Sequence, residues 1–258
     1  MTHDEPSSVT GDAPRLAGRV ALVTGSGGGL GRELALGLGA RGCHVACHYA
    51  SDASGAAQTA RLITDAGGTA HTFSADLADS AARTTLVTAV THVLGAIDVL
   101  VNNAARTAFI PFDDLARADD ALWRDLLELN LLAPVALVRS VLPAMGARGY
   151  GRVLNIASTS AVEPEGSSLP YAVSKSALVA FTRGLAAVAP PGVTINALAP
   201  GWMDTGWAPR QGGERPGARA EAVVTDVAAL GLTLLANAAV NGEVVMVDGG
   251  ARWRRRHG

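Results

Sequence analysis

Residues 19–31 read RVALVTGSGGGLG, and residues 32–41 continue with RELALGLGAR. The letters VALV form a continuous apolar run, which is typical of a strand buried on both faces of a sheet. The glycines that follow permit positive φ angles and close approach of the backbone to another molecule. A helix that starts near Leu30 would then aim its N–H groups at an anion. The stretch therefore predicts a strand, a phosphate-binding turn and a helix.

The spacing of these glycines excludes two common nucleotide-binding motifs. The pattern Gly25-x-x-x-Gly29-x-Gly31 differs from G-x-G-x-x-G, and no Gly-Lys-Ser/Thr sequence ends it as in a Walker A loop. Dinucleotide binding is the favoured interpretation, because the turn combines glycines with a helix N-terminus. A glycine-rich turn that binds no ligand is the alternative.

The same alternation of short apolar runs and longer helical stretches continues to the C-terminus. Strands are predicted at residues 19–24, 43–49, 69–75, 97–102, 152–157, 194–198 and 243–247. Helices are predicted at residues 30–41, 53–66, 80–94, 121–147, 170–188 and 224–237. Strand–helix–strand repeats of this kind form right-handed parallel crossovers. The predicted fold is α/β: a single domain with a Rossmann-type, doubly wound parallel sheet of about seven strands and helices on both faces.

The chain is predicted to consist of three segments. Residues 1–15 are polar and are predicted to be a disordered N-terminal segment, whereas residues 16–250 form the folded domain. Residues 251–258 form a basic C-terminal tail, for which solvated disorder is expected and contact with nucleic acid or a neighbouring subunit is the alternative. The connection that begins at residue 201 is long, and long connections in compact domains are usually functional or disordered.

The composition is that of a packed globular protein. Of 258 residues, 48% are hydrophobic and 17% are charged, with a net charge of -2, so nucleic acids and anionic membranes are not expected as partners. Apolar stretches are interrupted well short of about 18 residues, so no transmembrane helix is expected. The polar N-terminus lacks the apolar region of a signal peptide, which favours a cytoplasmic location.

Cysteine and histidine spacing predicts neither a disulfide nor a metal site. Cys43 and Cys47 lie on one predicted strand, where four residues separate them by about 13 Å at about 3.3 Å per residue. That distance is too long for a disulfide. The six histidines show no metal-ligand spacing with one another or with the cysteines. We therefore expect two structural thiols in a reducing compartment and no bound metal.

Lys175 is the single lysine among 21 basic residues, and it follows Tyr171 by four positions. Residues at i and i+4 of a helix project from the same face. An ammonium beside a phenol favours the phenolate and lowers the phenol pKa from about 10, so the pair is expected to exchange protons near neutral pH. A site that needs a compact ammonium would explain why one lysine is retained among arginines. An ordinary surface pair is the alternative.

Eight motifs occur in order along the chain. They are Thr24-Gly25-x3-Gly29-x-Gly31, Asp76-Leu77, Asn102-Asn103-Ala104-Ala105, Asn130, Ser158, Tyr171-x3-Lys175, Pro200-Gly201 and Val247-Asp248-Gly249-Gly250. This series resembles the short-chain dehydrogenase/reductase family, and within it the 3-oxoacyl-reductase-like subgroup, over roughly residues 16–250. The resemblance implies an NAD(P)-binding Rossmann domain and an oxidoreductase that acts between CH–OH and C=O groups.

The resemblance also implies four catalytic residues. Tyr171 would donate a proton to a substrate carbonyl, or accept one from an alcohol. Lys175 would bind the nicotinamide ribose and depress the tyrosine pKa, and Ser158 would hydrogen-bond the reacting oxygen. Asn130 would hold a local kink and a water that links Lys175 to solvent, with a solvent-facing asparagine in mid-helix as the alternative.

Contacts to the cofactor are implied in the same way. Those in the glycine turn are Gly25, Ser26, Gly29, Leu30 and Gly31. Those at the adenosine end are Tyr49, Ser51, Asp76, Leu77, Asn102 and Ala104, with Asp76 accepting from the adenine amino group. Those at the nicotinamide end are Tyr171, Lys175, Pro200, Gly201 and Thr205, with Thr205 holding the carboxamide.

NADP(H) is favoured over NAD(H) as the cofactor. NAD preference usually requires a carboxylate at the end of the second strand, where this chain has Tyr49, and Asp52 lies too far along. The arginine that often binds a 2′-phosphate is also missing, both at Ala50 and at Gly28. The groups that could still bind a phosphate are Ser51, His48 and Arg32.

The expected activity is reduction of a ketone by NADPH, on a small or ring-containing substrate. Residues 201–225 correspond to a substrate lid that is shorter than is common in the family, which suggests an open pocket. Trp202, Met203 and Trp207 could stack on a ring or form the apolar underside of the lid. Binding of an acyl carrier protein is not expected, because the arginines that contact it in relatives fall near Pro143 and Gly192.

Two other functions are alternatives. One is an NAD-dependent alcohol dehydrogenase of the sugar, steroid or cyclic-diol type, and the other is a non-catalytic regulator that senses a dinucleotide. The partner that the sequence predicts is a small carbonyl or alcohol substrate. Relatives pair through two long helices beside the active site, which implies a homodimer or a homotetramer.

Overall fold

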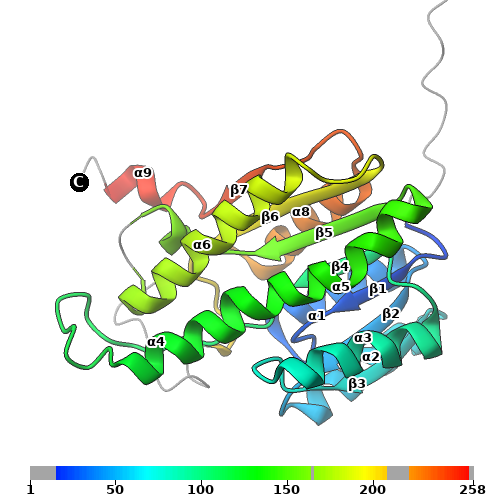
Figure 1. Cartoon of the computed structure of the whole chain (residues 1–258), viewed down its shortest axis with the longest axis horizontal. Coiled ribbons are helices and arrows are strands. Elements are labelled where there is room, and N and C mark those ends of the chain that lie inside the picture. The colour runs from blue at the N-terminus through cyan, green and yellow to red at the C-terminus, as the bar shows by residue number, and fades with distance from the viewer. Residues whose placement is uncertain (1–15, 164–165, 208–220, 256–258) are drawn as a thin grey trace, which may run out of the picture.

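The computed structural model describes residues 16–163, 166–207 and 221–255. In this part of the chain, seven parallel strands form one sheet in the order β3-β2-β1-β4-β5-β6-β7, with helices on both faces (Figure 1). The predicted single-domain, doubly wound α/β fold is confirmed. The predicted N-terminal segment, residues 208–220 of the lid and the last residues of the tail lie outside the described residues.

Every predicted strand and helix is present, with ends that differ by a few residues. The strands are β1 (Val20–Val23), β2 (His44–Tyr49), β3 (Thr69–Ser74), β4 (Val99–Asn102), β5 (Gly151–Ile156), β6 (Val193–Pro200) and β7 (Val244–Val247). The helices are α1 (Gly29–Ala40), α2 (Ala53–Asp65), α3 (Ser80–Leu94), α4 (Asp120–Leu127), α5 (Ala133–Arg148), α6 (Leu169–Ala186), α8 (Val224–Ala236) and α9 (Ala251–Arg255). A π-helical turn, η1 (Glu128–Leu132), joins α4 to α5, and a 3-10 turn, η2 (Thr159–Ala161), follows β5.

Each face of the sheet is covered by its own group of helices (Figure 1). Helices α1, α2 and α8 cover one face, where Leu34, Leu38 and Leu232 are buried in one core. Helices α3, α5 and α6 cover the other face, where Leu137 and Ile195 belong to a second core. Strands between two cores must be apolar on both sides, which explains the continuous apolar run of β1.

The strand order reverses at β1, which pairs with β2 on one side and with β4 on the other. The connections that leave β1 and β4 therefore diverge, and they open a crevice at the carboxyl ends of these strands. The glycine turn follows β1 directly, and residues 103–106 follow β4. The fold thus brings both segments to the carboxyl ends of the strands, where a ligand site is expected.

The long helix from α4 to α5, Asp120–Arg148, is long and apolar enough to cross a membrane by length and composition, with a mean hydropathy of 1.5. The expectation that no transmembrane helix is present considered only uninterrupted apolar runs, and a helix in the core of a globular domain can pass the same test of length and composition. In the structure, Leu137, Val138 and Val141 pack in the second core. A buried helix face in a domain core accounts for the apolar composition.

The C-terminal tail differs from the expected solvated disorder. Residues Ala251–Arg255 form α9, and Ala251 is buried. Asp248 orders the start of this helix, because its Oδ1 accepts from the Gly250 N–H at 2.9 Å and its Oδ2 accepts from the Arg252 N–H at 3.2 Å. A carboxylate that caps a first turn stabilises a helix even in a basic segment.

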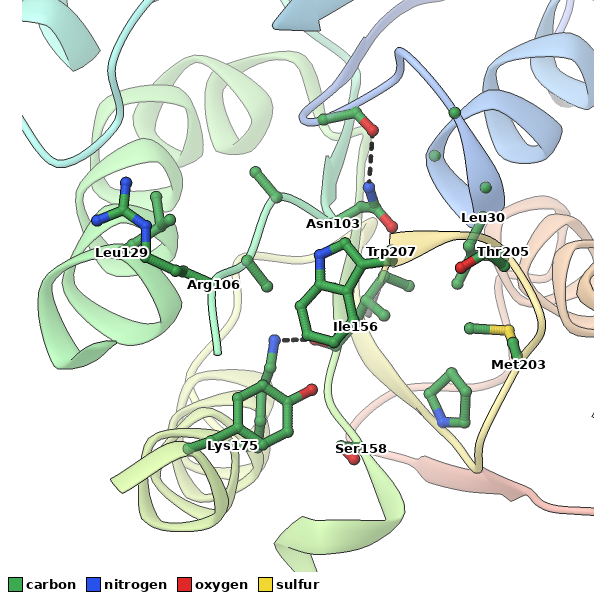
Figure 2. A pocket seen from close by; sticks show the side chains of 18 of the residues that line it. Leu30, Asn103, Arg106, Leu129, Ile156, Ser158, Lys175, Met203, Thr205 and Trp207 are labelled. Carbon is green, nitrogen blue, oxygen red and sulfur yellow. Dashed lines mark hydrogen bonds between the residues drawn. The ribbon is translucent and has the colours of Figure 1, made fainter. Parts of the chain in front are cut away.

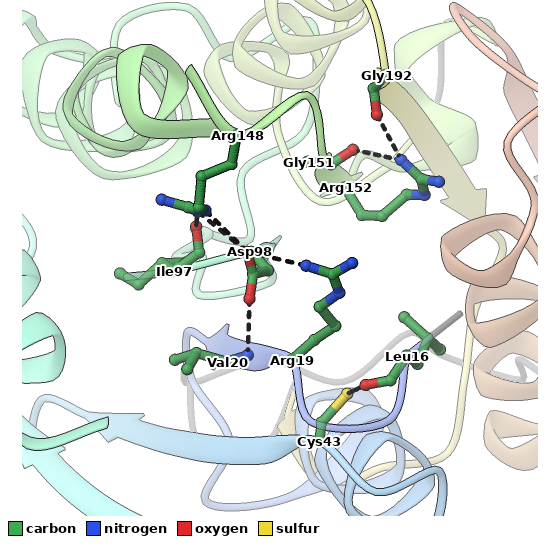
Figure 3. A network of polar contacts seen from close by, with 10 residues as sticks. All are labelled: Leu16, Arg19, Val20, Cys43, Ile97, Asp98, Arg148, Gly151, Arg152 and Gly192. Atoms are coloured by element: carbon green, nitrogen blue, oxygen red, sulfur yellow. Dashed lines mark hydrogen bonds and ion pairs between the residues drawn. The ribbon is translucent and has the colours of Figure 1, made fainter. Parts of the chain in front are cut away.

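At the amino ends of the strands, opposite the crevice, a buried carboxylate joins several elements (Figure 3). Asp98, just before β4, is 7% exposed. It accepts from the Val20 N–H at 3.2 Å and from Arg148 Nη2 at 3.0 Å, and Arg19 Nη1 lies 3.8 Å away. The Arg19 guanidinium also lies over the Tyr150 ring, 3.7 Å from its centroid. These contacts hold the amino ends of β1, β4 and β5 together.

Asp98→Asn is expected to lower the free energy of unfolding by about 2–3 kcal/mol, because it leaves the arginines without their anionic partner. Denaturant unfolding followed by circular dichroism measures this change. The matched control is Asp120→Asn, whose carboxylate pairs with Arg124 at 2.9 Å where both side chains are largely exposed. The control should lose less than about 1 kcal/mol. Equal losses would contradict the role given to Asp98.

Candidate active site

A cavity of about 500 Å³ lies in the crevice at the carboxyl ends of the strands. It extends from the glycine turn to α6, and Figure 2 shows part of its lining. The predicted site residues that line it are Gly25, Gly29, Leu30, Gly31, Tyr49, Ser51, Asp76, Leu77, Ala104, Ser158, Tyr171, Lys175, Pro200, Gly201 and Thr205. The fold therefore brings most of the predicted catalytic and cofactor-binding groups to one cavity.

The glycine turn is too crowded for side chains. Gly25 and Gly29 adopt φ angles of 66° and 52°, in the left-handed region that favours glycine. A Cβ on Gly31 would lie 2.2 Å from the Gly25 carbonyl oxygen. Helix α1 starts at Gly29, and its N-cap residue is Gly28, which has no side chain to bind the first N–H groups. The N-terminus of α1 therefore presents N–H donors and a positive dipole end, which suit a pyrophosphate.

Two side chains hold the glycine turn in place. His48 Nδ1 accepts from the Gly25 N–H at 3.2 Å, and its Nε2 donates to the Ala75 carbonyl at 3.0 Å. Burial lowers the pKa of His48 to about 4, so the ring is neutral and keeps one donor and one acceptor. Arg32 Nη2 donates to the Gly27 carbonyl at 2.6 Å. His48 and Arg32, which the sequence offered as phosphate ligands, instead bind the backbone of the turn.

Two predicted cofactor contacts do not line the cavity. The Ser26 side chain is fully buried and donates to the His48 carbonyl at 3.2 Å. Asn102, the last residue of β4, points into the core and donates to Asn155 Oδ1 on the neighbouring strand at 2.8 Å. Asn103 lines the cavity in its place. Asn103 follows the end of β4, so the strand prediction did not determine which of the two asparagines faces the cavity.

Two carboxylates line the cavity beside β2 and β3, at the end where the sequence predicts adenosine. Asp52 lines it, although the sequence analysis placed this residue too far along the chain. Its Oδ1 accepts from the Gly55 N–H at 2.9 Å and so caps α2. Asp76 Oδ1 accepts from the Ala78 N–H at 2.9 Å. Each carboxylate thus stabilises the turn that follows its strand, β2 or β3.

Tyr171, Lys175 and Ser158 line the other end of the cavity, where Figure 2 labels Lys175 and Ser158. Tyr171 and Lys175 lie one turn apart on α6 and are 9% and 2% exposed. Lys175 Nζ donates to the Ile156 carbonyl at 2.8 Å and lies 5.8 Å from the centroid of the Tyr171 ring. Ser158 Oγ donates to Ser160 Oγ, 3.1 Å away, and lines the cavity with Tyr171. The burial of the pair excludes the alternative of an ordinary surface contact.

Burial, rather than the charge of the lysine, sets the protonation of this pair. It raises the pKa of Tyr171 to about 12, against the lowering effect of the hydrogen bond from Ser158. It lowers the pKa of Lys175 to about 7. The net shift of the Tyr171 pKa is therefore upward, opposite to the predicted lowering, because desolvation penalises both charged forms. The effect of Lys175 itself stays a prediction. Tyr171 keeps its proton near neutral pH, whereas Lys175 exchanges one.

Asn130 lies in η1, where the structure has the kink expected in the long helix. Its Oδ1 accepts from the Arg106 N–H at 2.9 Å, and its Nδ2 donates to the Arg106 carbonyl at 2.9 Å and to Ser174 Oγ at 3.0 Å. At 1% exposure it does not face solvent, and it does not line the cavity, although Leu129 does. Asn130 therefore joins the loop after β4 to α6. Its water relay to Lys175 stays a prediction.

An apolar wall covers the catalytic end of the cavity. The Trp207 and Tyr171 ring centroids lie 6.2 Å apart, with an interplanar angle of 46°. Trp202, Met203, Phe109 and Leu129 also line the cavity. The sequence analysis missed Phe109 and Leu129, because their position depends on how the loop after β4 and η1 fold around the site.

Comparisons with known proteins identify the family of this chain. The profile of the family described as short chain dehydrogenase matches residues 19–215. A protein of Streptomyces violaceoruber, named as ketoacyl reductase 2 of the granaticin polyketide synthase, is 38% identical over 250 residues, which cover 93% of this chain and 98% of that protein.

Two solved structures are similar over nearly their whole length. A gluconate 5-dehydrogenase from Burkholderia cenocepacia J2315, in complex with NADP and tartrate, has a TM-score of 0.82 and 31% identity, covering 94% of this chain and 98% of that one. A variant of actinorhodin polyketide ketoreductase with NADPH has a TM-score of 0.80 and 31% identity, covering 92% of this chain and 97% of that one.

The fold and the site define an oxidoreductase with a Rossmann-type dinucleotide site. The chain belongs to the short-chain dehydrogenase/reductase family and is similar to its 3-oxoacyl reductases. It is an enzyme that acts between CH–OH and C=O groups. The recognition made from the motif series is confirmed.

Lys175 is expected to make the free energy of unfolding rise as the pH increases from about 7 to about 9, below the range in which Cys43 and Cys47, whose pKa burial raises from 9.0, have the opposite effect. Burial lowers the pKa of Lys175 from 10.5 to about 7, so in this range the unfolded chain binds a proton that the folded chain has released. Lys175→Met removes the group and should flatten this part of the curve. Denaturant unfolding of both proteins at several pH values measures the effect. Parallel curves would show that Lys175 keeps its ordinary pKa in the folded protein.

Proposed function

We propose that the protein is an NADPH-dependent reductase of a small or ring-containing ketone, with Tyr171 as the general acid. The observation that carries this proposal is the buried Tyr171 phenol, which lines the same cavity as Ser158, Lys175 and the glycine turn. A phenol that keeps its proton near neutral pH is suited to donate it to a developing alkoxide. This supports ketone reduction over alcohol oxidation.

The residues present fit a nicotinamide dinucleotide. The N–H groups at the start of α1 would hold the pyrophosphate, and Asp76 would accept from the adenine amino group. A Cβ on Gly29 would lie 3.1 Å from the Thr205 Cβ, so the loop after β6 closely approaches the glycine turn. Thr205, Pro200 and Gly201 would then hold the carboxamide. When bound, the nicotinamide supplies the hydride that the reaction transfers.

The chain's own residues supply the proton. The Ser158 and Tyr171 hydroxyls would hydrogen-bond the substrate carbonyl oxygen and polarise it. As the carbonyl carbon gains the hydride, the Tyr171 O–H bond breaks and its proton goes to the carbonyl oxygen, which leaves an alcohol and a phenolate. Lys175, with a pKa of about 7, would return a proton to the phenolate. Asn130 and a water would connect Lys175 to solvent.

NADP(H) is the proposed form of the cofactor. Tyr49, and not a carboxylate, ends β2 beside the cavity, and the Ser51 hydroxyl could donate to a 2′-phosphate there. The two similar solved structures hold NADP or NADPH. The charge of Asp52 opposes a phosphate, but its Oδ1 is held at the N-cap of α2.

A ring-containing ketone suits the catalytic end of the cavity. Trp207, Phe109 and Met203 could contact the faces of a ring, while the hydroxyls of Ser158 and Ser160 could bind its polar edge. The granaticin relative is named for a polyketide synthase, which supports this class. We propose a free ketone rather than one attached to a carrier protein, since the positions that would bind the carrier are uncharged.

Ketone reduction is expected to be at least about 10-fold more efficient in kcat/KM with NADPH than with NADH, a difference of about 1.4 kcal/mol in transition-state binding. Spectrophotometric assays with a panel of acyclic, cyclic and quinone substrates measure the ratio. A preference for NADH, with secondary alcohols oxidised better than ketones are reduced, would instead support the NAD-dependent alcohol dehydrogenase.

Tyr171→Phe is expected to lower kcat for ketone reduction by about 10²–10⁴-fold, because it removes only the proton donor. Binding of NADPH, followed by fluorescence, should be retained. Tyr150→Phe is the matched control, since the Tyr150 ring lies between Arg19 and Arg152 at the far edge of the sheet. Normal reduction by Tyr171→Phe would rule out the assigned role. A wild-type protein that binds NADPH yet reduces no ketone would favour the non-catalytic regulator.

A further inference from the structure

Helix α3 has a charged residue, Arg83, on its buried face. The helical spacing of the buried residues would favour an aliphatic side chain at this position. The buried residues of this helix are Arg83, Leu86 and Val90, which form one stripe. Arg83 is 6% exposed, and a guanidinium keeps its charge in proteins. A buried charge is stable only where hydrogen-bond acceptors satisfy it. The location of those acceptors indicates what Arg83 does.

The acceptors of Arg83 belong to two different walls of the cavity. Its Nε donates to the Leu77 carbonyl at 2.6 Å and its Nη2 to the Ala78 carbonyl at 3.1 Å, both on the loop after β3. Nη2 also pairs with Glu128 Oε1, at the start of η1. Leu77 lines the adenosine end of the cavity, and Leu129, which follows Glu128, lines it as well. One planar group therefore joins the two walls.

The contacts continue from η1 to the catalytic helix. Asn130, two residues after Glu128, donates to Ser174 Oγ at 3.0 Å. Ser174 immediately precedes Lys175 on α6, and its hydroxyl donates to the Tyr171 carbonyl at 2.7 Å. Two sets of polar contacts, joined by the backbone of η1, thus connect the adenosine wall to the helix that carries the proton donor.

We infer that Arg83 is a positioning residue that couples the adenosine end of the site to η1 and, through η1, to the catalytic helix. The inference rests on the proposed dinucleotide function. A bound adenosine group fixes the loop at Leu77, which keeps Arg83 against Glu128 and η1 in the arrangement where Asn130 supports α6. Linkage is reciprocal for binding, so loosening η1 weakens binding at the adenosine end.

The test changes Glu128, which lies on η1 and does not line the cavity. Glu128→Ala removes the anion that holds Arg83, so 2′,5′-ADP, which reaches only the adenosine end, should bind at least about 5-fold more weakly. Glu128→Gln keeps an acceptor oxygen and should restore most of the affinity. Titration calorimetry on the full chain measures binding. The kcat for ketone reduction should fall in Glu128→Ala and recover in Glu128→Gln.

Two further variants separate positioning from stability. Arg83→Met should also weaken 2′,5′-ADP binding, and the double variant with Glu128→Ala should bind no more weakly than Arg83→Met, because both changes remove one contact. Asp98→Asn is expected to lower the free energy of unfolding, but it lies at the amino ends of the strands, away from the cavity. This variant should bind 2′,5′-ADP like the wild type. If Arg83→Met does not fold, the two Glu128 variants carry the comparison by themselves.

Wild-type affinity for 2′,5′-ADP in Glu128→Ala would overturn the inference. Additive losses in the double variant would overturn it as well, and so would an equal loss in Asp98→Asn, since the affinity would then follow stability. A wild-type protein that binds neither 2′,5′-ADP nor AMP would instead contradict the proposed function, because both are adenosine halves of a nicotinamide dinucleotide. The two failures are therefore distinguishable.

Discussion

The burial of Tyr171 and Lys175 on one face of α6 is the constraint on which the site depends. Desolvation raises the pKa of the phenol to about 12 and lowers the pKa of the ammonium to about 7. Lys175 Nζ is held at 2.8 Å by the Ile156 carbonyl, at the end of β5. Because β5 ends at the same edge of the sheet as β1, this pair faces the glycine turn across one cavity. Proton donor and dinucleotide site are therefore positioned by the same parallel sheet.

Several polar side chains in and behind the walls of the cavity bind backbone groups. His48 and Arg32 hold the glycine turn, Asn130 holds the loop after β4, and Arg83 holds the loop after β3. Each of these side chains hydrogen-bonds backbone N–H or C=O groups that have no partner within their own turn. The walls of the cavity are loops and turns whose backbone is held by side chains that lie behind them. Asp98 holds the strands together at their amino ends, away from the cavity.

The fold and much of the site could be predicted from the sequence, because apolar runs, glycine spacing and the Tyr171–Lys175 separation are local features. The directions of individual side chains could not. Ser26 and Asn102 belong to the recognised motifs, yet they point into the core, and Asn103 lines the cavity instead. The pKa of Tyr171 was predicted in the wrong direction, since the desolvation that raises it arises only when β5 and neighbouring loops pack around α6.

The central claim is that Lys175 exchanges its proton near neutral pH beside a tyrosine that keeps its own. Because the chain has one lysine, protein labelled with lysine carrying ¹³C at Cε gives a single lysine signal in NMR spectra. Titration of that signal from about pH 5 to about pH 10 reports the pKa directly. We expect a midpoint at about 7. A midpoint near the ordinary lysine value of about 10.4 would contradict this account of the site.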